Sequence, residues 1–259
     1  MTNAYVYRSE TPARLVKTDD LVESAKDQIA LNLAVISLGD PVDVDEIKKS
    51  PDDAVARLLG ELAQVRAIAD KGVAAAAVKV SLPLPGPMRL DPMLLSGLMC
   101  NLVNQGATIL ELDGSAYGLN AELDAADDGF TLMGLPKPEG FRLAINMGAL
   151  SNWSADRLAE IAEELAADRY IFAINAGDDV SALAKLPEDS IAVLGLIDPA
   201  GGQSNDDILD LIDVAAEVLD QERLALTVRD GFDAVHADSQ QKVLYQLAEV
   251  SDIFWGLAV

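Results

Sequence analysis

The chain has 259 residues, half of them apolar, and a formal net charge of −24. A chain of this size can bury one sizeable core, so residues 1–259 are expected to form a single domain. Nucleic acid and anionic membrane surfaces would repel so acidic a protein, which excludes them as partners. No signal peptide and no apolar run long enough to span a bilayer is found, and Cys100 is the only cysteine, so we expect a cytoplasmic protein without disulfides.

Short apolar runs alternate with amphipathic stretches along the whole chain. The runs predicted to be strands are 31–38, 74–82, 107–112, 141–146, 169–175, 191–197, 223–228 and 253–259. Between them apolar residues recur at intervals of three and four, as at Leu158, Ile161 and Leu165, which indicates helices. The alternation predicts an α/β fold, and eight strands predict a single (β/α)8 TIM barrel, with a doubly wound open sheet as the alternative.

The two ends of the chain complete this prediction. The last predicted strand ends at Val259, which leaves no residues for an eighth outer helix. Residues 19–29 are therefore expected to form an N-terminal helix that covers its place. The long segment 114–140 is rich in Gly, Asp and Pro and is a candidate lid or substrate loop.

Polar residues stand where the predicted strands end. In a barrel of parallel strands these ends meet at one mouth, which is where active sites lie. Glu111 and Asp113 are two residues apart on one strand and therefore point to the same face, where two carboxylates could raise one another's pKa and act as acid and base. The alternative for each polar residue is a structural role in a turn or cap, and for Arg229 an ion pair with Asp230 or another rim acid. The full set is Asp40, Lys79, Ser81, Glu111, Asp113, Asn146, Asn175, Asp198, Arg229 and Asp230.

Four stretches carry a resemblance to a known family. They are "VKVSLPLPGPMRL" (78–90), "NQGATILELDGS" (104–115), "VLGLIDPAGGQSNDDILDLI" (193–212) and "ERLALTVRDGFD" (222–233). Together they resemble the C-terminal catalytic barrel of cobalamin-independent methionine synthase, whose fold is shared by uroporphyrinogen decarboxylase. The resemblance runs from about residue 74 to the end. It implies a methyl transfer from a folate to a thiolate that a zinc ion activates.

The resemblance assigns roles residue by residue. Where the family has a Gln-x-Asp-Glu-Pro run, this chain has Glu111 to Ser115 and only the Asp matches, so Asp113 inherits a role in binding the substrate's amino group. The family's four zinc ligands fall on Ala144, Asn146, Asn175 and Asp230, and none of them matches. Zinc is therefore not expected, because its soft sulfur and imidazole ligands are missing. The three oxygen donors leave a hard cation such as Mg²⁺ as an alternative.

The resulting hypothesis is a zinc-free methionine-synthase-like protein. It would transfer a methyl or alkyl group to a small amino-acid or thiol-like substrate, with a folate as the methyl donor that the resemblance suggests. A cofactor-free decarboxylase or lyase, and a non-catalytic ligand-binding or partner protein, are the alternatives, so whether the chain is an enzyme stays open. A separate protein subunit or a second copy of the chain would be its protein partner. The expected catalytic residues are Glu111, Asp113 and Asp230, and the expected substrate-binding residues are Lys79, Ser81, Ser115, Asn146, Asn175, Asp198 and Arg229.

Overall fold

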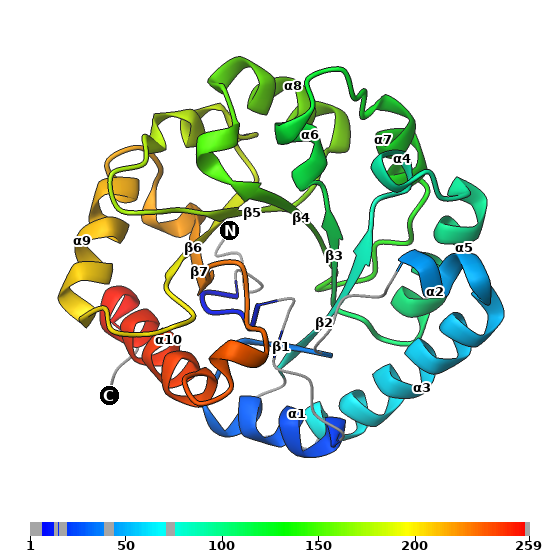
Figure 1. Cartoon of the computed structure of the whole chain (residues 1–259), viewed down its shortest axis with the longest axis horizontal. Helices are drawn as coiled ribbons and strands as arrows, with labels where there is room; N and C mark the ends of the chain where they lie inside the picture. Colours follow the sequence, from blue (N-terminus) through cyan, green and yellow to red (C-terminus); the bar gives the residue numbers. More distant parts are fainter. Residues whose placement is uncertain (1–6, 13–14, 16–19, 39–43, 71–75, 257–259) are drawn as a thin grey trace.

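The computed structural model describes residues 7–12, 15, 20–38, 44–70 and 76–256, and Figure 1 shows strands surrounded by helices. The strands are β1 (Val35–Ser37), β2 (Ala77–Pro83), β3 (Ile109–Asp113), β4 (Arg142–Ala149), β5 (Arg169–Ala173), β6 (Ile191–Ile197) and β7 (Leu224–Val228). The α-helices are α1 (Leu21–Ala30), α2 (Val44–Lys49), α3 (Pro51–Ala69), α4 (Pro85–Met88), α5 (Pro92–Asn104), α6 (Ser115–Leu119), α7 (Ala126–Met133), α8 (Ala155–Leu165), α9 (Asn205–Ala216) and α10 (Gln240–Trp255). The 3-10 helices are η1 (Leu150–Asn152), η2 (Val180–Lys185), η3 (Gln221–Arg223) and η4 (Ala234–His236).

The seven strands form one sheet in which each strand pairs in parallel with the next along the chain. Every residue of β2, β5, β6 and β7 is buried, as expected where helices cover the outer face of a parallel sheet. The sheet curls, with its helices on the outside (Figure 1). The prediction of a parallel α/β fold is thus confirmed.

An extended segment at residues 8–11 joins the two edges of this sheet. On one side the Glu10 amide donates to the Leu226 carbonyl of β7 at 3.0 Å, and the Leu226 amide donates to the Arg8 carbonyl at 2.8 Å. On the other side the Val35 amide of β1 donates to the Ser9 carbonyl at 3.1 Å. Both bridges are parallel, so the strand edges of β1 and β7 are each paired with this segment.

The end of the chain differs from the prediction. The strand expected at 253–259 is wrong, because Ile253, Phe254 and Trp255 form the last turn of α10, while 257–259 lie outside the described residues. Helix α10 packs against β7 and α9, so the place of the helix thought to be missing is filled by α10 itself. Helix α1, expected to cover that place, instead packs against α3 and β1.

The predicted loop at 114–140 contains two helices, α6 and α7, joined and followed by irregular segments. Among the described helices, none is both long and apolar enough to cross a membrane. Asp40 lies outside the described residues.

The interior of the curled sheet holds a small apolar cluster of its own, separate from the main core between sheet and helices. It contains Val35, Ala77, Ile109, Ala144, Ile171, Ile191, Val193 and Ala225. Side chains alternate along a strand, so the residues two and four positions beyond Ala77 and Ile109 also point inward. These residues are Lys79 and Ser81 of β2 and Glu111 and Asp113 of β3. The same rule therefore places a polar layer directly above the apolar one.

Candidate functional site

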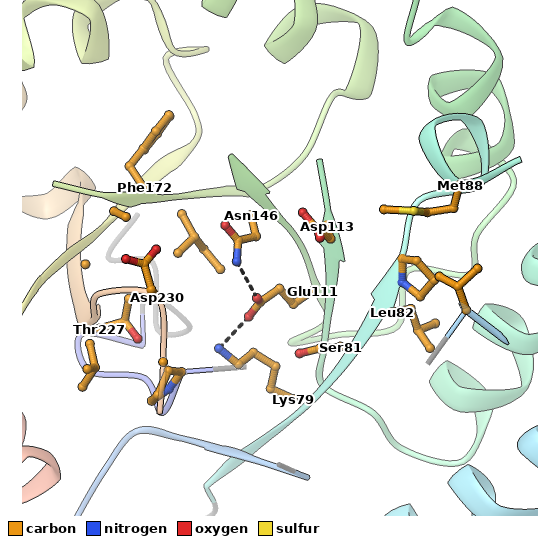
Figure 2. A pocket seen from close by; sticks show the side chains of 18 residues that line it. Lys79, Ser81, Leu82, Met88, Glu111, Asp113, Asn146, Phe172, Thr227 and Asp230 are labelled. Atoms are coloured by element: carbon orange, nitrogen blue, oxygen red, sulfur yellow. Dashed lines mark hydrogen bonds and ion pairs between the residues drawn. The ribbon is translucent and has the colours of Figure 1, made fainter. Parts of the chain in front are cut away.

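A cavity of about 190 Å³ opens above the apolar interior, at the carboxyl ends of the strands. Apolar residues such as Leu82, Met88, Ile171 and Phe172 form part of its wall. Its polar lining consists of Lys79, Ser81, Glu111, Asp113, Asn146, Thr227 and Asp230. Figure 2 shows Lys79, Glu111 and Asn146 connected in a row across the cavity.

Buried ionic groups form a chain behind this lining. The Lys79 ammonium lies 2.7 Å from a carboxylate oxygen of Glu111 and 3.0 Å from one of Glu10. The other oxygen of Glu10 accepts from the Arg169 guanidinium, at 2.7 Å from Nη2 and 3.2 Å from Nε. All four side chains are at most 3% exposed, and the cavity meets the chain at Lys79 and Glu111.

The burial and pairing of these groups determine their protonation. Burial alone would raise the pKa of Glu10, but Lys79 and Arg169 together hold it below its usual value. Burial alone would lower the pKa of Lys79, but the two carboxylates outweigh this and raise it, so the side chain stays an ammonium. Burial raises the pKa of Glu111, repulsion from Glu10 adds to it, and Lys79 and Asn146 offset only part of the increase. Glu111 therefore takes up a proton more readily than an ordinary glutamate.

A break in strand register orients Asn146. The pairing of β4 with β5 shifts between Asn146 and Ala149, and Gly148 adopts a φ of +68° there. The Gly148 amide donates to Asn146 Oδ1 at 3.0 Å, which leaves Nδ2 to donate to Glu111 at 3.3 Å. A side chain at Gly148 would approach Ser115 Cβ to 2.9 Å, so glycine suits both the conformation and the space.

Two exposed carboxylates line the mouth of the cavity, and Figure 2 shows them on either side of Asn146. Asp113 Oδ1 accepts from the Ser115 amide at 3.0 Å and from the Ser115 hydroxyl at 2.6 Å. Asp230 adopts a φ of +57°, a conformation that is uncommon outside glycine and that clusters at functional sites. The buried Ser81 hydroxyl has no hydrogen-bond partner among the described residues, so it can serve a ligand.

Three of the expected binding residues form a separate group on the rim. Arg229 donates to Asn175 at 2.8 Å and pairs closely with Asp198, so its partner is a rim acid other than Asp230. None of the three lines the cavity, and Ser115 contributes only through its hydrogen bonds to Asp113. Six of the ten expected site residues therefore share the cavity, namely Lys79, Ser81, Glu111, Asp113, Asn146 and Asp230.

The residues at the family's zinc positions do not fit that metal. Ala144 has no donor, and Asn175 is bound to Arg229 outside the cavity that Asn146 and Asp230 line. No group of three His, Cys, Asp or Glu side chains in the described part of the chain is placed to hold a metal ion. The oxygen donors considered for a hard cation do not form one site either, because Asn146 and Asp230 line the cavity and Asn175 lies outside it.

Sequence reasoning missed two members of the ionic chain. Glu10 lies in a polar stretch without the apolar run that marks a strand, and Arg169 is the first residue of a run otherwise read as core. Their contact joins positions 159 residues apart. The one available signal was a charged residue at the head of a buried strand, since a buried charge requires a partner.

Comparison with known proteins defines the class of fold. No protein-family model and no curated protein matches the sequence. Solved structures do match, among them a dihydrodipicolinate synthase from Agrobacterium tumefaciens, 11% identical with a TM-score of 0.53, over 97% of this chain and 82% of that chain. The chain has an α/β fold with neighbours of the TIM-barrel type.

Two further structures are more similar. One is a protein from Listeria monocytogenes assigned as a vitamin B12-independent methionine synthase, 14% identical with a TM-score of 0.69, over 91% of this chain and 86% of that chain. The other is a B12-independent methionine synthase from a Shewanella species in complex with selenomethionine, 12% identical with a TM-score of 0.70, over 97% of this chain and 99% of that chain. The resemblance to methionine synthases is thus confirmed for the fold.

Proposed function

We propose that the chain is a zinc-independent enzyme that transfers a methyl or alkyl group to a small amino-acid or thiol-like substrate. The observation that supports it most is the buried Glu111 carboxyl, which faces the cavity with a raised pKa between Lys79 and Asn146. A carboxyl tuned in this way can act as a general base or acid, and perturbed groups in a cavity mark functional sites.

The reaction uses Glu111 in place of a metal. A thiol has an ordinary pKa of about 8.5 and must lose its proton to attack. Glu111 would accept the S–H proton as the sulfur forms its bond to the methyl carbon, while the bond from that carbon to the donor breaks and its electron pair leaves with the donor. A methylated folate is the donor that we propose. Glu111 would then release the proton to the departing donor group or to water.

The size and charge of the cavity favour a small substrate whose cationic group lies at the mouth. Cavities for drug-sized ligands occupy roughly 300 Å³ or more, and this one is smaller, so it suits an acceptor of amino-acid size and leaves most of a folate outside. Lys79 is the only described cation in the lining, and two carboxylates already bind it. Asp113 and Asp230 at the mouth favour an ammonium group.

The proposal extends to the architecture. The segment at residues 8–11 lies parallel to both β7 and β1 and would serve as the remaining strand of a closed (β/α)8 barrel. Glu10 would then belong to the first strand, and α10 would be the eighth helix.

Binding and turnover test the proposal separately. The protein is mixed with homocysteine, methionine and a methylated folate, melting temperatures are recorded, and methylated product is sought by mass spectrometry. We expect thiol and amine ligands to raise the melting temperature, and Glu111→Gln to abolish transfer while ligands still bind. Glu61→Gln, an ion-pair partner of Arg57 on the outer helix α3, is the matched control and should retain full activity. Binding without transfer by the unmodified protein would favour a non-catalytic ligand-binding protein, and no response to any ligand would refute the proposal.

A further inference from the structure

The N-terminal segment brings a charged side chain into the interior of the sheet. The segment is held on both sides by backbone hydrogen bonds, and the Thr227 hydroxyl donates to the Glu10 carbonyl at 2.9 Å. The Glu10 side chain is fully buried as a result. Its position is therefore fixed by the sheet and not by its own ion pairs alone.

Glu10 divides the charge of Lys79 between two carboxylates. One carboxylate oxygen of Glu10 forms an ion pair with Lys79 and the other forms an ion pair with Arg169, so both oxygens have a cationic partner. Glu111 has the same ammonium at 2.7 Å and otherwise only the Asn146 amide at 3.3 Å within the described residues. A cation that pairs with a single carboxylate strongly stabilises the ionised form of that carboxylate. A second carboxylate nearby repels the first and opposes this stabilisation.

We propose that Glu10 is a positioning residue of the cavity: it prevents Lys79 from pairing with Glu111 alone and so keeps Glu111 able to take up and release a proton. The catalytic meaning of this role rests on the proposed function, but the electrostatic linkage does not. Glu10 does not line the cavity, and it acts on the reacting group only through Lys79.

The charged groups around Glu111 come from several elements. Lys79 is on β2, Asp113 is on β3 with Glu111 itself, Arg169 is on β5, and Asp230 follows β7. The two aspartates are at the exposed mouth, where water screens them, whereas Glu10 and Lys79 are buried. Glu10 is therefore the carboxylate with the greatest effect on Glu111.

The test measures the protonation of Glu111 directly. Its side-chain carboxyl carbon is followed by ¹³C NMR across the pH range, and the signal is assigned by its loss in Glu111→Gln. In Glu10→Gln, which keeps the shape but removes the charge, we expect the Glu111 titration midpoint to fall by about one pH unit or more. Glu10→Asp, which keeps the charge, should stay closer to the unmodified protein.

A neighbouring substitution separates this role from simple support of the fold. The Thr11 hydroxyl donates to the Val35 carbonyl at 2.8 Å, so Thr11→Val weakens the same segment without changing any charge. We expect a lower melting temperature and an unchanged Glu111 midpoint. If Glu10→Gln does not fold, the double variant Glu10→Gln/Arg169→Met removes one charge of each sign. Its Glu111 midpoint should also fall, but by less, because the loss of the Arg169 charge opposes the change.

The outcomes are distinct. A Glu111 midpoint that stays in place in folded Glu10→Gln or in the folded double variant, or one that moves equally in Thr11→Val, would overturn the positioning role even if methyl transfer is observed. A lowered midpoint in a protein that transfers no methyl group would support the linkage and count only against the proposed function.

Discussion

Replacing Lys79 by methionine tests how much of the stability depends on the buried ionic chain. The change removes contacts of 3.0 Å to Glu10 and 2.7 Å to Glu111, while Glu10 keeps its contact to Arg169. Glu111 then keeps only the Asn146 amide among the described residues and should become protonated. Protonating a carboxyl of ordinary pKa about 4.3 at pH 7 requires up to about 3.7 kcal/mol, at about 1.36 kcal/mol per pH unit. We therefore expect a loss of about 3–4 kcal/mol at pH 7, in the range found for broken buried ion pairs.

Urea denaturation at two pH values measures this effect. Lowering the pH from 7 to 5 should recover up to about 2.7 kcal/mol of the difference in free energy of unfolding between Lys79→Met and the unmodified protein, because protonating Glu111 then costs less free energy. Lys79→Met/Glu111→Gln removes the carboxylate that needs the cation and should regain most of the loss at pH 7. A deficit that is equal at both pH values and persists in the double variant would refute the reasoning and assign the effect of Lys79 to packing.

Three further outcomes are expected. Asp113→Asn should weaken an amine-bearing ligand by about 1–3 kcal/mol in calorimetric titration, and an unchanged affinity would remove Asp113 from the binding site. Burial alone would lower the pKa of Lys79, but its two carboxylates raise it in the folded protein. Its contribution to stability is therefore complete below the pKa of about 10.4 in the unfolded chain and is lost as the pH rises through the pKa in the folded protein. Unfolding curves above pH 10 should show declining stability. Gly129→Ala places a Cβ 2.1 Å from the Glu164 carbonyl oxygen and should lower the free energy of unfolding by about 1–3 kcal/mol or more. Gly60→Ala on α3 has no atom within 4 Å of the added Cβ, and it should raise the free energy of unfolding by about 0.5–1 kcal/mol in the same denaturation assay.

Strands in the middle of the chain were predictable because both of their faces are buried. The run at 191–197 coincides with β6, because the helices on one face and the interior of the curled sheet on the other both require apolar side chains there. The same reasoning failed at Ile253–Trp255, where an apolar helix end has the composition of a short buried strand. The segment at residues 8–11 gave no signal, because its buried side chains include Ser9, Glu10 and Thr11. Polar partners inside the curled sheet receive these side chains, so a polar strand-like segment is stable there.

The site was predictable as far as local rules reach. Alternation along β3 indicated that Glu111 and Asp113 share a face, and both line the cavity. Asn175 and Arg229 also follow strand ends, but their side chains bind one another on the rim, which depends on turn geometry. The contacts of Glu10 to Lys79 and Arg169 join residues from three distant parts of the chain, and no pattern in one sequence encodes such pairing.

The pairing of residues 8–11 with β7 has a consequence for the order of folding. Glu10 and Thr227 are 217 residues apart, so pairing this segment with β7 closes a very long loop. Contacts over such a distance form late, because the entropy of closing the loop must be overcome before they contribute. Glu10 also cannot leave water until Lys79 and Arg169 are in place to receive it. We therefore expect Glu10 to become buried only after the strands that carry Lys79 and Arg169 have assembled.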